Sequence, residues 1–245
     1  MSLITDAQVA QFRELGYFVT APMFSEAELA PVREEFDRLH RERIAEAEQG
    51  QDAKAIELAR YRPFIGQAHT RSAVLHRLVR APIYLEACAR FIGPDADLYY
   101  NQVVIKPPEK GQSFAWHQDS GYVLTNPLAY ITCWTAISAT TLENGCIWVI
   151  PKSHTWGLQE HRHDEVTRQL YVDCPETDAI AVPMAAGQVA IFSSLTLHKS
   201  GPNTSGTVRR GYVPQYHVPN VISVKSGKPW GDLHPVLRGG RPVEA

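Results

Sequence analysis

The chain has 245 residues and a formal net charge of −2, with 44% hydrophobic and 20% charged residues. This length can bury a sizeable core, and we expect a single domain over residues 1–245. The near-neutral charge gives no long-range attraction to nucleic acid or to an anionic membrane surface, so neither partner is expected. The sequence shows no apolar stretch that would span a membrane and no charged and apolar opening of a secretory signal.

The four cysteines indicate a cellular location. Cys88, Cys133, Cys146 and Cys174 form no C-x-x-C pair. Neither a zinc knuckle nor a disulfide framework is therefore indicated. Reduced core cysteines are typical of a cytoplasmic protein, which is the location we expect.

Residues 1–95 are expected to form a helix-rich flank. Ser25 and Glu28 have the spacing of a capping box at a helix start. The apolar residues that follow recur at helical spacing and should pack on the rest of the protein: Leu29, Val32, Phe36 and Leu39. The charged stretch 41–60 predicts a solvated helix or a loose connection. Residues 82–91 predict one more short helix, ended by Gly93 and Pro94.

Residues 96–222 have the pattern of a β-rich core. Short runs rich in Val, Ile, Tyr and Trp alternate with turn residues, at 99–105, 130–137, 146–150, 179–182, 188–192 and 209–218. This spacing favours a sandwich or barrel of antiparallel strands over βαβ units. The polar segment 154–178 is long for a hairpin connection, so we interpret it as a lid or binding loop. Residues 223–245 are expected to form a C-terminal tail, frayed near Gly239 and Gly240.

The most informative motif is His117-Gln118-Asp119 together with the distant His198. Side chains alternate along an extended segment, so His117 and Asp119 can both reach one metal ion. His198 ends a glycine-led apolar run of the β type. Two imidazoles and one carboxylate on one face of an octahedral ion leave the opposite face open, an arrangement associated with non-heme Fe(II) oxygenases. Each histidine should donate its second ring N–H to a carbonyl or a carboxylate.

H-x-D alone is a weak signal, because it occurs often by chance. Seven of the eight other histidines are expected to lie outside the metal site: His69, His76, His154, His161, His163, His217 and His234. Two arginines follow the second histidine of the motif. A turn-rich segment separates His198 from a strand-like run that starts at Arg209, and an antiparallel hairpin of this kind would hold Arg209 close to the metal. Arg210 would point to the other side of the strand, and the physics alone does not choose between them.

At these residues the chain resembles the phytanoyl-CoA dioxygenase (PhyH) family of Fe(II)/2-oxoglutarate-dependent oxygenases. The resemblance covers most of the chain, as an ordered set of short segments. These are residues 3–19, Ile105-Lys106-Pro107-Pro108, the H-x-D motif, Trp134-Thr135-Ala136-Ile137, Glu143-Asn144-Gly145-Cys146, Ile150-Pro151-Lys152-Ser153-His154, and His198-x-Ser200 with Arg209. The resemblance implies a mainly β fold with flanking helices and a double-stranded β-helix (jelly-roll, cupin-like) core.

The resemblance also implies a role for each motif residue. His117, Asp119 and His198 would bind Fe(II), which leaves positions for 2-oxoglutarate and O2. The family's spacing selects Arg209 over Arg210 for the 5-carboxylate of 2-oxoglutarate, a group that suits a planar guanidinium. The remaining matches near the cosubstrate are Ser200, Gln102 and Trp134.

The implied reaction is hydroxylation of an unactivated C–H bond of a small molecule, such as a secondary metabolite, an amino acid or an acyl compound, with release of succinate and CO2. Family halogenases have a small residue at the ligand carboxylate, so Asp119 favours C–H oxidation. Two departures stand out: Ser138-Ala139 replaces an acidic pair, and the upstream lysine of some members has no obvious match, since no lysine lies between Lys54 and Lys106.

Two other classes of protein share the fold, a metal-dependent cupin-type isomerase or lyase and a non-catalytic jelly-roll binding protein. Neither would need an arginine at position 209. The sequence leaves open the identity of the substrate, the choice among hydroxylation, desaturation, epoxidation and cyclisation, and the oligomeric state.

Overall fold

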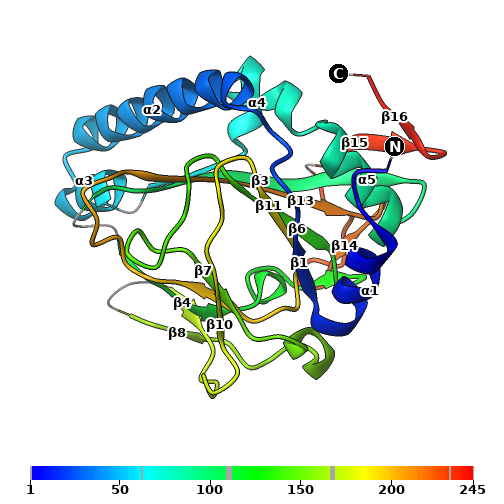
Figure 1. Cartoon of the computed structure of the whole chain (residues 1–245). Coiled ribbons are helices and arrows are strands. Elements are labelled where there is room, and N and C mark those ends of the chain that lie inside the picture. Colours follow the sequence, from blue (N-terminus) through cyan, green and yellow to red (C-terminus); the bar gives the residue numbers. More distant parts are fainter. Residues whose placement is uncertain (1, 62, 109–111, 166–168, 232, 245) are drawn as a thin grey trace.

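The computed structural model describes residues 2–61, 63–108, 112–165, 169–231 and 233–244. Two antiparallel sheets make up most of the structure (Figure 1). The larger sheet has the order β1 (Tyr17–Val19), β11 (Val189–Ser193), β6 (Ile131–Ala136), β13 (Arg209–His217), β3 (Ala96–Lys106), β15 (His234–Arg238) and β16 (Arg241–Pro242), with β2 (Phe64–Gly66) also paired to β3. The smaller sheet has the order β10 (Ile180–Val182), β7 (Ile147–Val149), β12 (His198–Ser200) and β4 (Phe114–His117).

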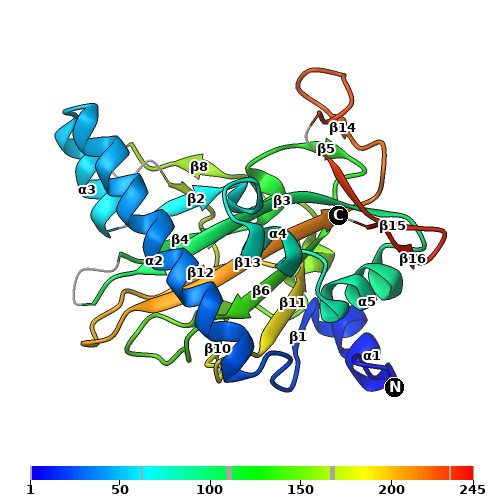
Figure 2. The same ribbon diagram turned by 90° about the horizontal axis from the view of Figure 1, so that it is seen from above.

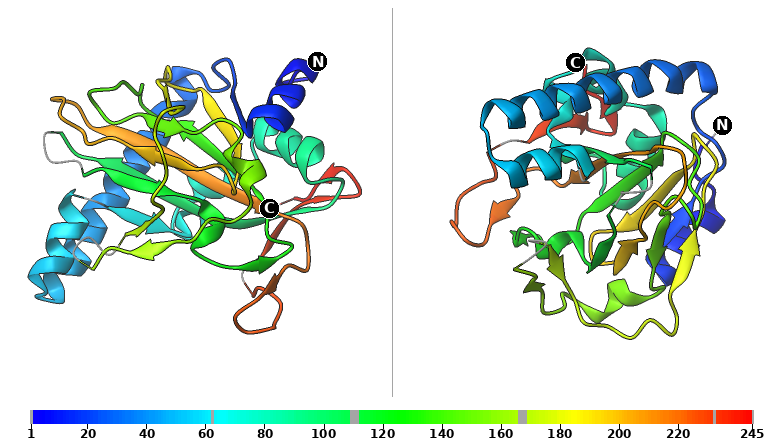
Figure 3. Two further views of the ribbon diagram at one scale, coloured as in Figure 1. Left: turned by 90° about the horizontal axis from the view of Figure 1, so that it is seen from below. Right: turned by 90° about the vertical axis from the view of Figure 1, so that its left-hand side faces the viewer.

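Apolar side chains of the two sheets meet in a shared cluster that includes Trp134, Ala190 and Val213 of the larger sheet and Ile147 and Val182 of the smaller one. The expected mainly β fold with a jelly-roll core is confirmed. Two further strand pairs lie outside the sheets, β5 (Thr125–Asn126) with β14 (Ile222–Ser223) and β8 (Arg162–His163) with β9 (Leu170–Tyr171). The segment around β14 projects from the body of the molecule (Figures 2 and 3).

Helices cover the face of the larger sheet that points away from the smaller one (Figure 2). They are α1 (Asp6–Leu15), α2 (Glu26–Gln49), α3 (Ala53–Tyr61), α4 (Ala73–Leu78) and α5 (Pro82–Phe91). The short 3-10 segments are η1 (Ala68–Thr70), η2 (Asp119–Gly121) and η3 (Ser153–Trp156). Within the described ranges, no helix has the length and apolar character needed to cross a membrane.

Helix α2 begins at the predicted capping box. The Ser25 hydroxyl accepts a hydrogen bond from the Glu28 backbone N–H (3.4 Å), and the Glu28 carboxylate accepts one from the Ser25 backbone N–H (2.8 Å). All four apolar residues predicted for its inner face are buried, namely Leu29, Val32, Phe36 and Leu39. The prediction for this helix is confirmed, and stretch 41–60 proves to hold the end of α2 and almost all of α3.

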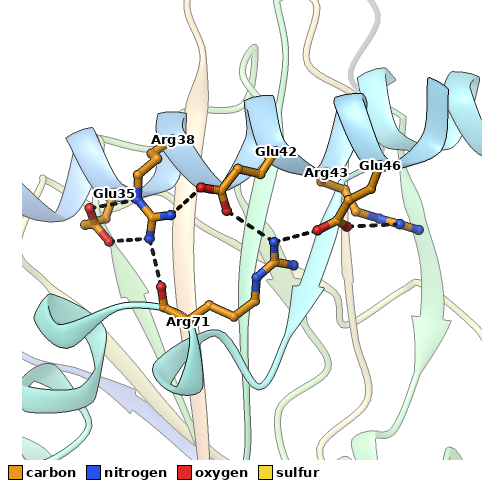
Figure 4. A network of polar contacts seen from close by, with 6 residues as sticks. All are labelled: Glu35, Arg38, Glu42, Arg43, Glu46 and Arg71. Carbon is orange, nitrogen blue, oxygen red and sulfur yellow. Dashed lines mark hydrogen bonds and ion pairs between the residues drawn. The ribbon is translucent and has the colours of Figure 1, made fainter. Parts of the chain in front are cut away.

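The outer side of α2 carries a network of ion pairs (Figure 4). Arg38 bonds Glu35 and Glu42, and its guanidinium also donates to the Arg71 carbonyl (2.8 Å). Arg71 in turn bonds Glu42 (3.2 Å) and Glu46 (2.8 Å). Each exposed pair adds little stability, but together they tie the segment before α4 to α2.

Strand β13 separates the helices from the interior. Its even-numbered residues face the helices: Arg210 pairs with Asp37 of α2 (2.7 Å), and the Tyr216 hydroxyl donates to the Val79 carbonyl (2.6 Å). Its odd-numbered residues Arg209, Val213 and Gln215 line the cavity between the sheets. This is the alternation expected of a regular strand.

The structure differs from the sequence-based expectation in two places. β12 and β13 are not a hairpin, because β12 pairs with β4 and β7 in the smaller sheet while β13 pairs with β3 and β6 in the larger one. The expected C-terminal tail contains β15 and β16, since Val236 and Leu237 are buried and β15 pairs with β3. Gly239 and Gly240 have positive φ and form the turn between these strands.

Candidate active site

A cavity of about 590 Å³ lies between the two sheets, and the three predicted metal ligands face it. His117 ends β4, Asp119 begins η2, and His198 begins β12, where it pairs directly with His117. Their ligand atoms all lie within 4.8 Å of one another. Nε2 of His117 is 3.8 Å from Oδ1 of Asp119, and Nε2 of His198 is 3.6 Å from the same oxygen. In the part of the chain that the structure describes, this is the one such cluster.

The other polar atoms of these ligands are already bonded. The Nδ1–H groups of His117 and His198 donate to the carbonyls two residues upstream, of Ala115 (2.7 Å) and Thr196 (3.0 Å). Both rings therefore carry their proton on Nδ1 and leave the Nε2 lone pair free. Burial, followed by the charge of the His198 ring, lowers the pKa of His117 and favours the neutral form that binds metal.

Asp119 is held in the same way. Its Oδ2 accepts hydrogen bonds from the Thr132 hydroxyl (2.6 Å) and the Gln215 amide (2.9 Å), so Oδ1 is left to face the two histidines. Two imidazole nitrogens and one carboxylate oxygen converge with their second polar atoms satisfied. That donor set fits a mononuclear Fe(II) ion with an open face.

Arg209 supplies the strongest sign of a missing anion. The side chain is 1% exposed, and Nη2 donates to the Gly145 carbonyl (3.3 Å) while Nε and Nη1 have no partner among the described residues. Its guanidinium carbon lies 5.2 Å from the centre of the Trp134 ring. Burial lowers the pKa of Arg209 to about 9, so the group is still charged at neutral pH. A buried cation with two free donors is costly unless a carboxylate pairs with it.

A second buried cation lies directly across the strand pair. Lys106 is 1% exposed and is the register partner of Arg209 on β3. Its ammonium donates to the carbonyls of Ser200 (3.4 Å) and Gly201 and lies 5.0 Å from the Phe114 ring centre. Burial, and then the charge of Arg209, lower the pKa of Lys106 to about 6. An anion beside Arg209 would favour the protonated lysine.

The structure brings every residue of the predicted site to this cavity. Ser200, Gln102 and Trp134 line it together with Arg209 and the three ligands, and so does Phe114. Gly211 lets Trp134 lie flat against β13, because a Cβ there would come within 2.4 Å of the indole ring. Arg210 is turned away toward Asp37. The segment 154–178 is not a lid in its described part: it lines no cavity wall and instead receives hydrogen bonds from Gln118 at Gly157 and His161.

The far end of the cavity is aromatic. Tyr99 and Tyr130 have ring centres 4.9 Å apart, and Trp230 lies 5.1 Å from Tyr99. All three line the cavity, as do Tyr100 and Tyr122.

Sequence reasoning missed Lys106, Thr132, Gln215 and the tyrosine pair. The strand alternation that places Gln102 inward also places Lys106 inward, and the same holds for Thr132 beside Trp134. That signal was available.

Comparison with known proteins agrees with this site. The sequence profile of the family described as Phytanoyl-CoA dioxygenase (PhyH) matches residues 12–211. The chain is 28% identical over 214 residues to the "Methylphosphonate hydroxylase" of Gimesia maris, across 84% of this chain and 78% of that protein. It is 23% identical over 248 residues to the "Probable alpha-ketoglutarate-dependent hypophosphite dioxygenase" of Stutzerimonas stutzeri, across 96% and 86%.

Solved structures show the same fold. The apo form of ThoJ, a non-heme monooxygenase, matches with a TM-score of 0.70 and 28% identity over 88% of this chain and 79% of that one. EvdO2 from Micromonospora carbonacea var. aurantiaca, complexed with 2-oxoglutarate, matches with a TM-score of 0.72 and 23% identity over 94% and 98%.

Proposed function

Because the chain belongs to the phytanoyl-CoA dioxygenase (PhyH) family of Fe(II)/2-oxoglutarate-dependent oxygenases, we propose that it hydroxylates an unactivated C–H bond of a small molecule. One oxygen atom of O2 enters the C–H bond of the substrate to give an alcohol. The other enters 2-oxoglutarate, which loses CO2 to become succinate. The four-electron reduction of O2 is balanced by two two-electron oxidations, of the substrate C–H bond and of 2-oxoglutarate.

The residues have distinct roles in this proposal. His117, Asp119 and His198 would hold an Fe(II) ion through Nε2, Oδ1 and Nε2. Arg209 binds the 5-carboxylate of 2-oxoglutarate with its free Nε and Nη1 donors, and the Ser200 hydroxyl adds a further hydrogen bond. Gln102 and Trp134 flank the cosubstrate from the neighbouring strands.

Bound iron and 2-oxoglutarate supply the oxidising power, while the protein supplies position and a dry environment. The Ala115 and Thr196 carbonyls fix the orientation of the two imidazoles, and Thr132 and Gln215 fix the carboxylate. Enclosure between the sheets excludes water from the reacting C–H bond. Substrate bound beside the open face of the triad is thereby held close to the oxidant.

The observation that carries the proposal is the pair of unpartnered donors on buried Arg209, in the same cavity as the triad. A cupin-type isomerase or lyase needs the metal but has no use for a second anion site. A non-catalytic binding protein needs neither. We also propose that residues 1–245 form one oxygenase domain, since strands from both ends of the chain join the larger sheet. Four free cysteines favour a cytoplasmic location.

The test is an anaerobic titration of the metal-free protein with Fe(II) and then 2-oxoglutarate. The expected result is a weak visible charge-transfer band that needs both additions. The band should be lost in His198→Ala and kept in His163→Ala, a matched control at an exposed histidine on β8. Iron binding without the band would contradict the proposal and favour a cupin-type enzyme or a binding protein.

A further inference from the structure

The aromatic end of the cavity contains two phenol groups with no assigned task. Tyr99 is 3% exposed and Tyr130 is 6% exposed, and both line the cavity. Neither hydroxyl forms a hydrogen bond with any residue in the described ranges. Neither hydroxyl oxygen is among the fully enclosed polar atoms without a partner, so both remain accessible from the cavity. Buried hydroxyl groups usually have a hydrogen-bond partner, so these two are available to donate to a ligand in the cavity.

Both tyrosines lie next to the residues that hold the metal carboxylate: Tyr130 is two residues before Thr132, and Tyr99 is adjacent to Tyr100, the register partner of Gln215. Burial, and then the negative charge of Asp119, raise the pKa of Tyr99 to about 12. The same two causes raise the pKa of Tyr130. The phenols therefore stay protonated at neutral pH and act as donors. A group that they bind would lie at the end of the strands that carries Thr132 and Gln215, the two partners of Asp119.

The surroundings of the pair select an uncharged ligand. Among the described residues that line the cavity, only Lys199 and Arg209 are cations, and the Lys199 ammonium is bound to Glu176 (2.6 Å) over the Trp116 ring. His217 packs against both tyrosines, but burial lowers its pKa to about 4, so the ring is neutral. Apart from the metal ion, no described residue at this end would pair with an anionic group, which would be desolvated there.

The aromatic side chains that line this end of the cavity favour a ligand with a largely apolar body. Tyr100 and Trp230 pack against the tyrosine pair, and Tyr122 lines the same cavity. Apolar side chains continue outward from the cavity along the β5–β14 strand pair: Tyr122 is 53% exposed, Leu124 43% and Val224 56%. The Val224 backbone N–H donates to the Leu124 carbonyl (2.9 Å), so these two residues lie side by side next to the β5–β14 strand pair. Exposed apolar side chains grouped at a cavity mouth are typical of a ligand-binding surface.

From these observations we infer that Tyr99 and Tyr130 bind an uncharged oxygen of the primary substrate, a carbonyl, hydroxyl or ether, on a ring-containing neutral molecule whose apolar body lies among Tyr100, Tyr122 and Trp230. The inference rests on the proposed function. Small phosphorus oxyanions, which give two of the relatives their names, do not fit this end of the cavity.

The test compares two bicyclic probes that differ at one group. 1-Tetralone carries a ketone, and tetralin carries a methylene in its place. Saturation-transfer NMR titrations of the anaerobic protein with Fe(II) and 2-oxoglutarate give the dissociation constant of each probe. We expect 1-tetralone to bind more tightly than tetralin by about three- to tenfold, the contribution of one net hydrogen bond, and methylphosphonate not to displace it.

Substitution separates the hydroxyls from the rings. Tyr99→Phe and Tyr130→Phe should each weaken 1-tetralone by about threefold or more and leave tetralin unchanged. Tyr171→Phe is the control, because Tyr171 on β9 is not among the residues that line the cavity. Unchanged 1-tetralone binding in both variants, an equal loss for tetralin, or displacement by methylphosphonate would overturn the inference.

The two proposals fail in different ways. The charge-transfer band is recorded in the same samples, and its presence with no tyrosine effect refutes only the substrate class. Its absence from the wild-type protein refutes the proposed function, while the probe titrations on the metal-free protein still test the tyrosine pair.

Discussion

At one end of the cavity two cations, Arg209 and Lys106, are buried across a strand pair, whereas at the other end two phenols, Tyr99 and Tyr130, meet without a cation among the described residues. The same strand, β3, contributes to both ends. The metal ligands lie between them. In the two proposals above, one end would bind the dianion 2-oxoglutarate and the other a neutral substrate. The difference shows how one cavity can keep a cosubstrate constant while its substrate varies.

The largest effect is expected when the arginine at the cationic end of the cavity is removed. Arg209→Ala leaves the 5-carboxylate of 2-oxoglutarate without its charged partner, and the dissociation constant should rise on the order of a hundredfold or more. The charge-transfer titration measures it. Arg210→Ala is the matched control, since it removes the neighbouring guanidinium that faces Asp37. Equal effects of the two substitutions would contradict the division of roles along β13.

The metal site between the two ends can be tested through Thr132, which holds Asp119. Thr132→Val removes a hydrogen bond to Asp119 and should weaken Fe(II) binding by roughly ten- to a hundredfold, the usual effect of losing a partner of a metal ligand. Thr135→Val removes an equally buried hydroxyl from the same strand, one that bonds Tyr84 instead. Both variants should lose similar stability on thermal unfolding. If Thr135→Val also weakened Fe(II) binding to the same degree, the effect would belong to β6 and not to Asp119.

A pH series examines the second cation. Lys106 has a pKa of about 6 in the folded protein and ordinarily near 10.5, so it is largely neutral at pH 7 to 8. The negative charge of 2-oxoglutarate favours the protonated form, so binding takes up a proton and the dissociation constant should rise with pH above 6, by up to about tenfold per unit. Lys106→Met should remove this slope. A slope that persists in the variant would assign the proton to another group.

The smallest effect is expected for the exposed apolar residues next to the cavity. Leu124→Ser removes a 43% exposed apolar side chain next to the cavity-lining Val123 and should weaken 1-tetralone by about two- to threefold, a fraction of the effect of burying a full leucine side chain. Leu142→Ser makes the same substitution at a 61% exposed site that does not line the cavity, and it should change nothing. A titration in which both variants bind the probe like the wild type would remove these exposed residues from the substrate site.

The local features of the fold were predictable, and the long-range ones were less so. The capping box of α2 and the opposite directions of Arg209 and Arg210 follow from spacing alone. The separation of β12 from β13 into different sheets does not, because both a hairpin and a crossing between sheets satisfy the same turn-rich segment. Strand β15 was read as part of a tail because its burial depends on pairing with β3, more than a hundred positions earlier in the chain.

The site shows the same division. The triad and Arg209 were identified because a known motif order supplied the pairing that no local pattern contains. Lys106 was not recognised as their neighbour, since its importance comes from the register of β3 against β13. Tyr99 lies where that register shifts, between the partners of Gln215 and Tyr216, so simple alternation does not determine the direction of its side chain.

The side chains of β13 alternate strictly between the cavity and the helices, and this alternation limits which sequence changes the strand can tolerate. A one-residue deletion immediately before Arg209 would move every residue of the strand to the opposite face. Arg210 would replace Arg209 in the cavity, so an arginine would still be present there. The same shift would move Gln215 away from Asp119 and bring Tyr216 into its place. Substitutions at single positions of β13 can therefore accumulate over evolution, while changes in its length are excluded.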